Sequence, residues 1–483
     1  MMKMKTKLAP NLEISRIVTG LWQIADMERG NNVLDLDATA FHMAPYVQAG
    51  MTTFDMADHY GSSEIIAGLF KNDHPHGSSV QLFTKWVPEP GIITRKMVRE
   101  AVQLSLDRMN QSTIDLLQFH AWYYPDPSWI DGLIYLNELR KEGLIRYLGV
   151  TNFDAAHLRV ACGTGIPIIS NQVCHSLLDR RAEGKLSSVC QEYGVQLLAF
   201  GTLAGGFLTE KWLGKAEPRP DQLSTWSEMK YKRFIDVAGG WDLFQNLLQA
   251  IKQVADRHGV SMANISSRFV LENPNVAAII IGARLGQSEH ITDNQELLKV
   301  QLTDIDIEEI KGAQSDLLAV PGDCGDEYRK PPFLTASGDL SHHLDRIPDV
   351  YEPVKTGRDR VQVFSGTEWE EYAGYCRALK DGNRIYISGT TATHGLIQIG
   401  GNDAGAQTHF VIDKIEAAIN SLGGSLEDVV RTRVFVHRME DWEAVARAHG
   451  DRFSGINPAN TLVQARLIGE GYLVEIEAEA IVK

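Results

Sequence analysis

The chain has 483 residues, more than one ordinary domain, so we expect two domains unless a barrel of about 250 residues accounts for much of the length. Its 44% hydrophobic and 23% charged residues are ordinary for a globular protein, and the net charge of −15 argues against binding to nucleic acid or an anionic membrane. The five cysteines have no metal-ligand spacing, and no secretory leader or apolar run of about 18 residues is present, which favours a cytoplasmic protein with free thiols.

From about residue 15 to 300, short β-rich runs alternate with helix-like segments. Eight runs predict strands, at 17–22, 52–56, 80–85, 114–119, 145–150, 166–172, 195–200 and 277–282. Strands that alternate with helices pair in parallel through right-handed crossovers, so we predict a (β/α)8 barrel. An open doubly wound sheet is the alternative, and the absence of a GxGxxG motif after the first strand argues against it.

The connection after the seventh strand is too long for a plain crossover. Residues 201–276 must hold a loop and an extra helix at about 241–257, and an insertion there can cover the barrel mouth. After the barrel, residues 316–357 are rich in Pro, Gly and Asp and lack periodicity, which predicts a linker or an extended arm.

A second pattern follows this arm. It predicts strands near 361–365, 374–379, 384–389, 428–437, 460–467 and 472–482, and helices at 404–421 and 440–453. Two helices among several strands indicate a compact α+β domain, which we place at residues 358–483.

Ionisable residues stand at three consecutive strand ends of the predicted barrel. Asp55 closes the second strand with Tyr60 in its loop, Lys85 closes the third, and His120 follows the fourth. Active sites of such barrels lie at the carboxyl ends of the strands, and closure places neighbouring ends side by side. Lys85 would favour the tyrosinate and lower the pKa of Tyr60, Asp55 would orient Lys85, and His120 would align a carbonyl oxygen. A proton donor without a nucleophile or a metal cluster requires a hydride donor, which indicates a nicotinamide cofactor.

The motifs FDMADHYG, FTKW, DLLQFH, GVTNF and NQV and the IIGAR…DN stretch occur in order on these strands. Together they resemble the signature of the aldo-keto reductase superfamily over residues 10–315. The resemblance implies a barrel that reduces aldehydes or ketones with NAD(P)H, with Asp55, Tyr60, Lys85 and His120 as the catalytic tetrad.

The same resemblance implies cofactor positions. Those expected to hold the carboxamide are Thr151, Asn152 and Gln172; Phe200 would stack on the nicotinamide; Leu203 and Gly205 would meet the pyrophosphate; and Gly282, Arg284, Ser288 and Asn294 would meet the adenosine phosphate end. The spacing from Gly282 to Asn294 is longer than the commonest family pattern. Arg284 favours the 2′-phosphate and therefore NADPH over NADH.

Three tryptophans, Trp22, Trp86 and Trp122, stand at or just beyond strand ends. They predict an aromatic wall around an apolar or ring-shaped substrate, and packing at the barrel rim is the alternative reading.

The stretches GYCRALKDGNRIYISGTTAT, QTHFVIDKIEAAINSLGG, NPANTLVQARLI and LVEIEAEAIV in residues 358–483 resemble the Rid, or YjgF-like, family. The resemblance implies a chorismate-mutase-like fold, a trimer, and ligand clefts between subunits whose residues here are Ser388, Asn460 and Glu475. Deaminating members carry an arginine at the position of Asn460, where it pairs with a substrate carboxylate. An amide lacks that charge, which argues against hydrolysis of an amino-acid-derived imine.

Three functions remain open from the sequence. The first is an NAD(P)H-dependent carbonyl reductase with an appended Rid-like domain for ligand binding or oligomerisation. The others are a nicotinamide-binding regulatory or scaffold protein, and a bifunctional reductase and deaminase. The intact tetrad favours the first.

Overall fold

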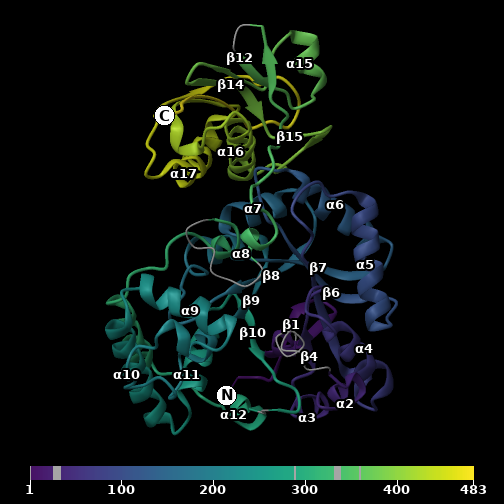
Figure 1. The fold of residues 1–483 in the computed structure, drawn as a ribbon, viewed down its shortest axis with the longest axis vertical. Coiled ribbons are helices and arrows are strands. Elements are labelled where there is room, and N and C mark those ends of the chain that lie inside the picture. Colours follow the sequence, from purple (N-terminus) through teal and green to yellow (C-terminus); the bar gives the residue numbers. More distant parts are fainter. Residues whose placement is uncertain (1, 25–33, 288–289, 331–338, 358–359) are drawn as a thin grey trace.

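The computed structural model describes residues 2–24, 34–287, 290–330, 339–357 and 360–483. A closed barrel of parallel strands forms the first domain, as predicted, and β10 completes the circle by pairing with β3 (Figure 1). Its strands are β3 (Ile17–Gly20), β4 (Thr53–Asp55), β5 (Gln81–Trp86), β6 (Ile114–His120), β7 (Ile145–Thr151), β8 (Ile168–Cys174), β9 (Gln196–Phe200) and β10 (Val276–Gly282). Each lies within two residues of its predicted position, because buried parallel strands are near-continuous apolar runs that the sequence displays directly.

A hairpin precedes the barrel and was not predicted. Its strands β1 (Lys5–Ala9) and β2 (Leu12–Ser15) pack Leu8, Leu12 and Ile14 into an apolar cluster with residues inside the barrel. Ser15 exchanges two hydrogen bonds with Thr53 at the start of β4, so the hairpin closes the end of the barrel opposite the strands' carboxyl ends.

Helices surround the barrel and occupy the long insertion. The helices are α2 (Leu36–Phe41), α3 (Ala44–Gln48), α4 (Ser63–Asp73), α5 (Arg95–Met109), α6 (Ser128–Lys141), α7 (Ala155–Gly163), α8 (Lys185–Tyr193), α9 (Trp226–Val237), α10 (Trp241–His258), α11 (Met262–Val270), α12 (Ile291–Glu296), α13 (Asp304–Ser315) and α14 (Asp326–Arg329). The predicted extra helix is α10, and α9 is a second one that the sequence did not reveal. None of the described helices has the length and apolar character that crossing a membrane requires.

The second domain is a seven-stranded sheet in the order β11-β12-β13-β14-β19-β17-β18, with α16 lying along it. Its elements are β11 (Val354–Thr356), β12 (Arg360–Val363), α15 (Glu368–Ala373), β13 (Ala378–Asp381), β14 (Arg384–Thr391), β15 (Thr393–His394), β16 (Ile397–Gln398), α16 (Ala404–Ser421), β17 (Val429–Val436), α17 (Trp442–Phe453), β18 (Ala459–Gln464) and β19 (Val474–Ile481). The predicted α+β architecture is confirmed, and α15, β11 and the short strands β15 and β16 are additions to it.

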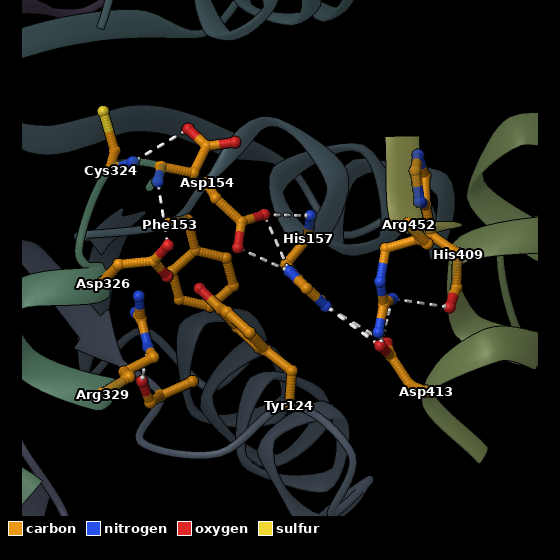
Figure 2. Close-up of polar contacts among 12 residues, drawn as sticks. Tyr124, Phe153, Asp154, His157, Cys324, Asp326, Arg329, His409, Asp413 and Arg452 are labelled. Atoms are coloured by element: carbon orange, nitrogen blue, oxygen red, sulfur yellow. Dashed lines mark hydrogen bonds and ion pairs between the residues drawn. The ribbon is translucent and has the colours of Figure 1, made fainter. Parts of the chain in front are cut away.

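The two domains meet through buried charged groups. Figure 1 shows α16 of the second domain against α7 of the barrel, and Figure 2 shows His157 of α7 between two carboxylates. His157 Nδ1 lies 2.7 Å from Asp154 in its own domain, and Nε2 lies 3.2 Å from Asp413 in the other. Asp413 also accepts from Arg452 at 2.5 Å. Burial lowers the pKa of His157, but the two carboxylates outweigh it and hold this pKa above its usual value.

Candidate active site

A cavity of about 690 Å³ opens at the carboxyl ends of the barrel strands. It is lined by residues that follow the strands and by residues from α9 and α14, which lie over the mouth. The four side chains predicted to be catalytic, Asp55, Tyr60, Lys85 and His120, all line it. The barrel therefore brings together residues that are up to 65 positions apart in the sequence.

Asp55 and Lys85 form a buried ion pair at the base of this cavity. Lys85 Nζ donates to Asp55 at 2.6 Å and to the backbone oxygen of Met56 at 2.7 Å. Burial lowers the pKa of Lys85, but the charges of Asp55 and Tyr60 outweigh it and the net pKa is raised. Lys85 is therefore held as an ammonium.

The second oxygen of Asp55 accepts two amide hydrogen bonds. The donors are Gln118 at 3.0 Å and Gln172 at 2.8 Å, and Gln172 also donates to Gln118 at 3.0 Å. Gln118 was missed in the sequence because it lies inside β6, two residues before the strand end. A polar residue inside a buried strand was the sequence signal that could have identified Gln118 as part of the site.

Tyr60 is half-buried in the wall of the cavity and is joined to Lys85 by a side-chain hydrogen bond. The ammonium lies 4.8 Å from the centre of the Tyr60 ring, and Trp22 packs edge-on against the same ring at 4.9 Å. Burial raises the pKa of Tyr60 to about 12, although Lys85 acts in the opposite direction. The effect of Lys85 thus has the expected sign, while the net pKa is higher than for free tyrosine because burial dominates. Tyr60 is a protonated phenol at neutral pH.

His120 offers an unused nitrogen to the cavity. Its Nε2 is buried and has no hydrogen-bond partner among the described residues. Burial lowers the pKa of His120 well below its usual value, and the nearby Arg329 guanidinium lowers it further. A neutral imidazole with a free nitrogen is suited to a hydrogen bond with a bound ligand.

The predicted cofactor positions surround the same cavity with one exception. Thr151, Asn152, Gln172, Phe200, Leu203, Gly205, Gly282, Arg284 and Asn294 line it, and Ser288 lies outside the described residues. The Oδ1 atom of Asn152 is buried without a partner in the described structure, so it can accept from a carboxamide NH₂. Gly205 has a φ of 63°, and a Cβ there would lie 2.9 Å from Tyr231. These groups fit a nicotinamide and its phosphates.

Two of the three tryptophans line the cavity, and the third lies in the core. Trp22 and Trp122 line the cavity, and Trp122 packs edge-on against His120 at 4.4 Å. Trp86 does not line it. Its ring packs on Phe119 in the apolar core at 5.5 Å, because its side chain alternates to the outer face of β5, opposite Lys85.

The predicted residues of the second domain lie on two faces of its sheet. Asn460 donates to Thr432 at 2.9 Å, and Thr432 is buried beneath α17 with His449 as its other partner. Glu475 lies beside Gly389, which follows Ser388 in β14. The Ser388 hydroxyl itself donates to the backbone oxygen of Cys376 at 2.8 Å.

Comparison with known proteins agrees with this geometry. The model of the Aldo/keto reductase family matches residues 16–315. The chain belongs to the aldo/keto reductase family. A second model, described as Endoribonuclease L-PSP, matches residues 366–482, so this aldo/keto reductase carries a Rid/YjgF-like domain, as predicted.

Individual relatives cover the two parts separately. Protein tas of Escherichia coli is 32% identical over 240 residues, which are 45% of this chain and 67% of that protein. An uncharacterized protein of Streptomyces coelicolor is 38% identical over 120 residues, 25% of this chain and 90% of its own. A glycerol dehydrogenase from Gluconobacter oxydans has the same barrel fold, with a TM-score of 0.54 and 23% identity over 66% of this chain and 98% of its own. The aldo/keto reductase is thus an oxidoreductase of a family that uses nicotinamide cofactors.

Proposed function

We propose that this aldo/keto reductase reduces an aldehyde or ketone, with Tyr60 as the general acid and NADPH as the hydride donor. The observation that carries the proposal is the hydrogen-bonded series from Asp55 through Lys85 to Tyr60, which lines the same cavity as His120 with its unpartnered Nε2. A protonated phenol and a neutral imidazole at one cavity suit a carbonyl oxygen that gains a proton.

Each residue has a distinct task in this proposal. The nicotinamide, when bound, supplies hydride to the carbonyl carbon. Tyr60 gives its proton to the carbonyl oxygen, and Lys85 stabilises the tyrosinate that this step leaves. Asp55 keeps Lys85 charged and oriented, and His120 positions the carbonyl oxygen through Nε2. In the reverse direction the same groups would accept the proton from an alcohol.

The proposal is tested with purified protein, NADPH and a panel of aldehydes and ketones. Consumption of reduced cofactor is followed by its absorbance, with product identified by chromatography. We expect turnover with at least some aldehydes. If no member of a chemically broad panel is consumed above the rate without protein, the reductase proposal is wrong.

We also propose that Arg284 gives a preference for NADPH, because this exposed cation lines the cavity, where its Nε donates to Gln23 at 3.3 Å. Exchanging this charge by Arg284→Gln is expected to weaken NADPH binding about tenfold, the loss of one charge-assisted hydrogen bond. NADH lacks the 2′-phosphate and serves as the internal control, with a change below about twofold. Fluorescence titration with both cofactors measures the effect, and equal weakening of the two would contradict it.

For the second domain we propose oligomerisation as a trimer. Three half-exposed apolar side chains lie on the sheet face opposite α16: Tyr386 in β14, Phe435 in β17 and Val463 in β18, where Phe435 and Val463 are paired. Copies of the same chain would cover this face, and a ligand cleft with Ser388 and Glu475 would lie at the contact. Light scattering should give three times the chain mass of 53.7 kDa, and a monomer at micromolar concentration would exclude it.

A further inference from the structure

The arm between the two domains forms part of the wall of the active-site cavity. It follows the segment matched by the aldo/keto reductase model, and its short helix α14 lies over the barrel mouth. Arg329 donates to the backbone oxygens of Ala121 at 2.6 Å and Asn152 at 2.7 Å, directly after the ends of β6 and β7. Gly325 has a φ of 84°, and a Cβ there would lie 2.2 Å from the Asn152 oxygen, so the close approach of the arm requires glycine.

Buried ion pairs fix this helix from its other side. Glu327 is fully buried, 2.9 Å from Arg181 and 3.3 Å from Lys230, and Arg181 is also 2.7 Å from Asp179. Two cations thus balance two carboxylates. Removing one partner from such a set is costly, so the position of α14 is defined by the charges beneath it.

Tyr328 is the residue of α14 that reaches the cavity. Its ring lies 6.0 Å from the ring of His120, and Lys230 donates to its hydroxyl oxygen at 2.9 Å. An ammonium can only donate, so the Tyr328 oxygen is the acceptor and its own proton must point elsewhere. No acceptor for that proton exists in the described parts of the chain. Burial raises the pKa of Tyr328, which keeps the hydroxyl protonated.

We propose that Tyr328 is a specificity-determining residue whose hydroxyl donates to a second oxygen of the substrate, one or two carbons from the reacting carbonyl. This inference rests on the proposed reductase function and names its substrate class, the hydroxycarbonyl compounds. Tyr60 and His120 take the carbonyl oxygen, and Tyr328 takes its neighbour. When a bound substrate displaces water from the cavity, a Tyr328 hydroxyl left without an acceptor penalises an analogue that lacks this oxygen, so the enzyme discriminates against simple alkyl aldehydes.

The test uses two isosteric pairs of substrates with the full chain and NADPH. Each pair exchanges one hydroxyl for a methyl group: 2-hydroxypropanal against 2-methylpropanal, and 3-hydroxybutanal against 3-methylbutanal. We expect wild type to favour the hydroxyl-bearing member of at least one pair by about tenfold in kcat/KM. Tyr328→Phe should remove most of this preference, chiefly through KM for the hydroxyaldehyde, while the alkyl aldehyde changes less than about twofold.

Tyr124→Phe is the matched control. It removes a hydroxyl from another buried tyrosine, which stacks on His157 and packs under Arg329 without lining the cavity (Figure 2). This variant should keep the wild-type preference. Titration with NADPH checks that Tyr328→Phe retains its fold, and affinity within about twofold of wild type is expected.

The outcomes separate the inference from the proposed function. Turnover of aldehydes by wild type with no hydroxyl preference, or a preference that Tyr328→Phe retains, overturns the role of Tyr328 and leaves the reductase function standing. An enzyme that consumes no carbonyl compound overturns both. If Tyr124→Phe loses the hydroxyl preference to the same extent, the preference depends on the general packing of the arm, and the proposal is also overturned.

Discussion

Tyr60→Phe is expected to lower kcat for aldehyde reduction by about 10²- to 10⁴-fold, the range typical of a lost general acid. The phenylalanine ring can still pack against Trp22, so the cavity keeps its shape and NADPH should bind within about twofold of its wild-type affinity. Stopped-flow or steady-state absorbance of NADPH gives kcat, and fluorescence titration gives the affinity. A variant that retains wild-type kcat would remove Tyr60 from the mechanism.

Lys85, which links Asp55 to Tyr60, allows a second and independent test of this mechanism. Lys85→Met should also reduce kcat strongly, because the buried tyrosinate would lose its only adjacent cation among the described residues. The double variant should be little worse than Tyr60→Phe, since residues that act as a unit are not additive. Fully multiplicative losses would show that Lys85 acts on a different step.

The pH dependence follows from the same geometry. Because burial raises the pKa of Tyr60 to about 12, the acid stays protonated throughout the ordinary range. Reduction should therefore lack an alkaline limb from Tyr60 below about pH 9, unlike the behaviour expected from a tyrosine whose pKa Lys85 had lowered.

The barrel and its tetrad were predictable because their signals are local. Asp55, Lys85 and His120 each follow an apolar strand, and closure of a parallel barrel converts that repeated position into proximity. The direction of a side chain is a weaker signal. Trp86 immediately follows Lys85, and alternation along β5 sends it into the core.

The remaining features depend on contacts that sequence periodicity does not encode. The helical stretch between β3 and β4 is divided into α2 and α3, with Pro45 in the first turn of α3. Tyr328 belongs to a segment without periodicity. The ion pairs of Glu327 and the hydrogen bonds of Arg329, its two neighbours, bring it to the cavity. The net pKa of Tyr60 likewise depends on the extent of burial, which the strand-end pattern does not give.

Asp413→Asn is expected to be the most destabilising conservative change at the junction of the two domains. Asp413 is buried between His157 of the barrel and Arg452 of its own domain, as Figure 2 shows. The asparagine amide carries no charge, so His157 and Arg452 would share one carboxylate fewer. Breaking such a set lowers the free energy of unfolding by about 3 kcal/mol. The urea or thermal midpoint of the transition measures the loss. Glu138→Gln provides a control, because it removes a carboxylate from an exposed pair with Arg95 and should shift the midpoint far less.

The size of this effect should change with pH in a defined direction. The pKa of His157 is raised in the folded state, so its contribution is complete below its unfolded pKa of about 6.5 and declines as the pH rises through the folded value. Burial raises the pKa of Asp413, but Arg452 and His157 outweigh it, so the net pKa is lowered. The contribution of Asp413 to stability is therefore complete above about pH 4 and is lost at lower pH.

The difference between wild type and Asp413→Asn should therefore be largest between about pH 4 and 6.5. It should shrink towards pH 9 without vanishing, because Arg452 remains charged and paired with Asp413. A difference independent of pH would mean that His157 is not an imidazolium, and the junction would then be held by Arg452 and apolar packing alone.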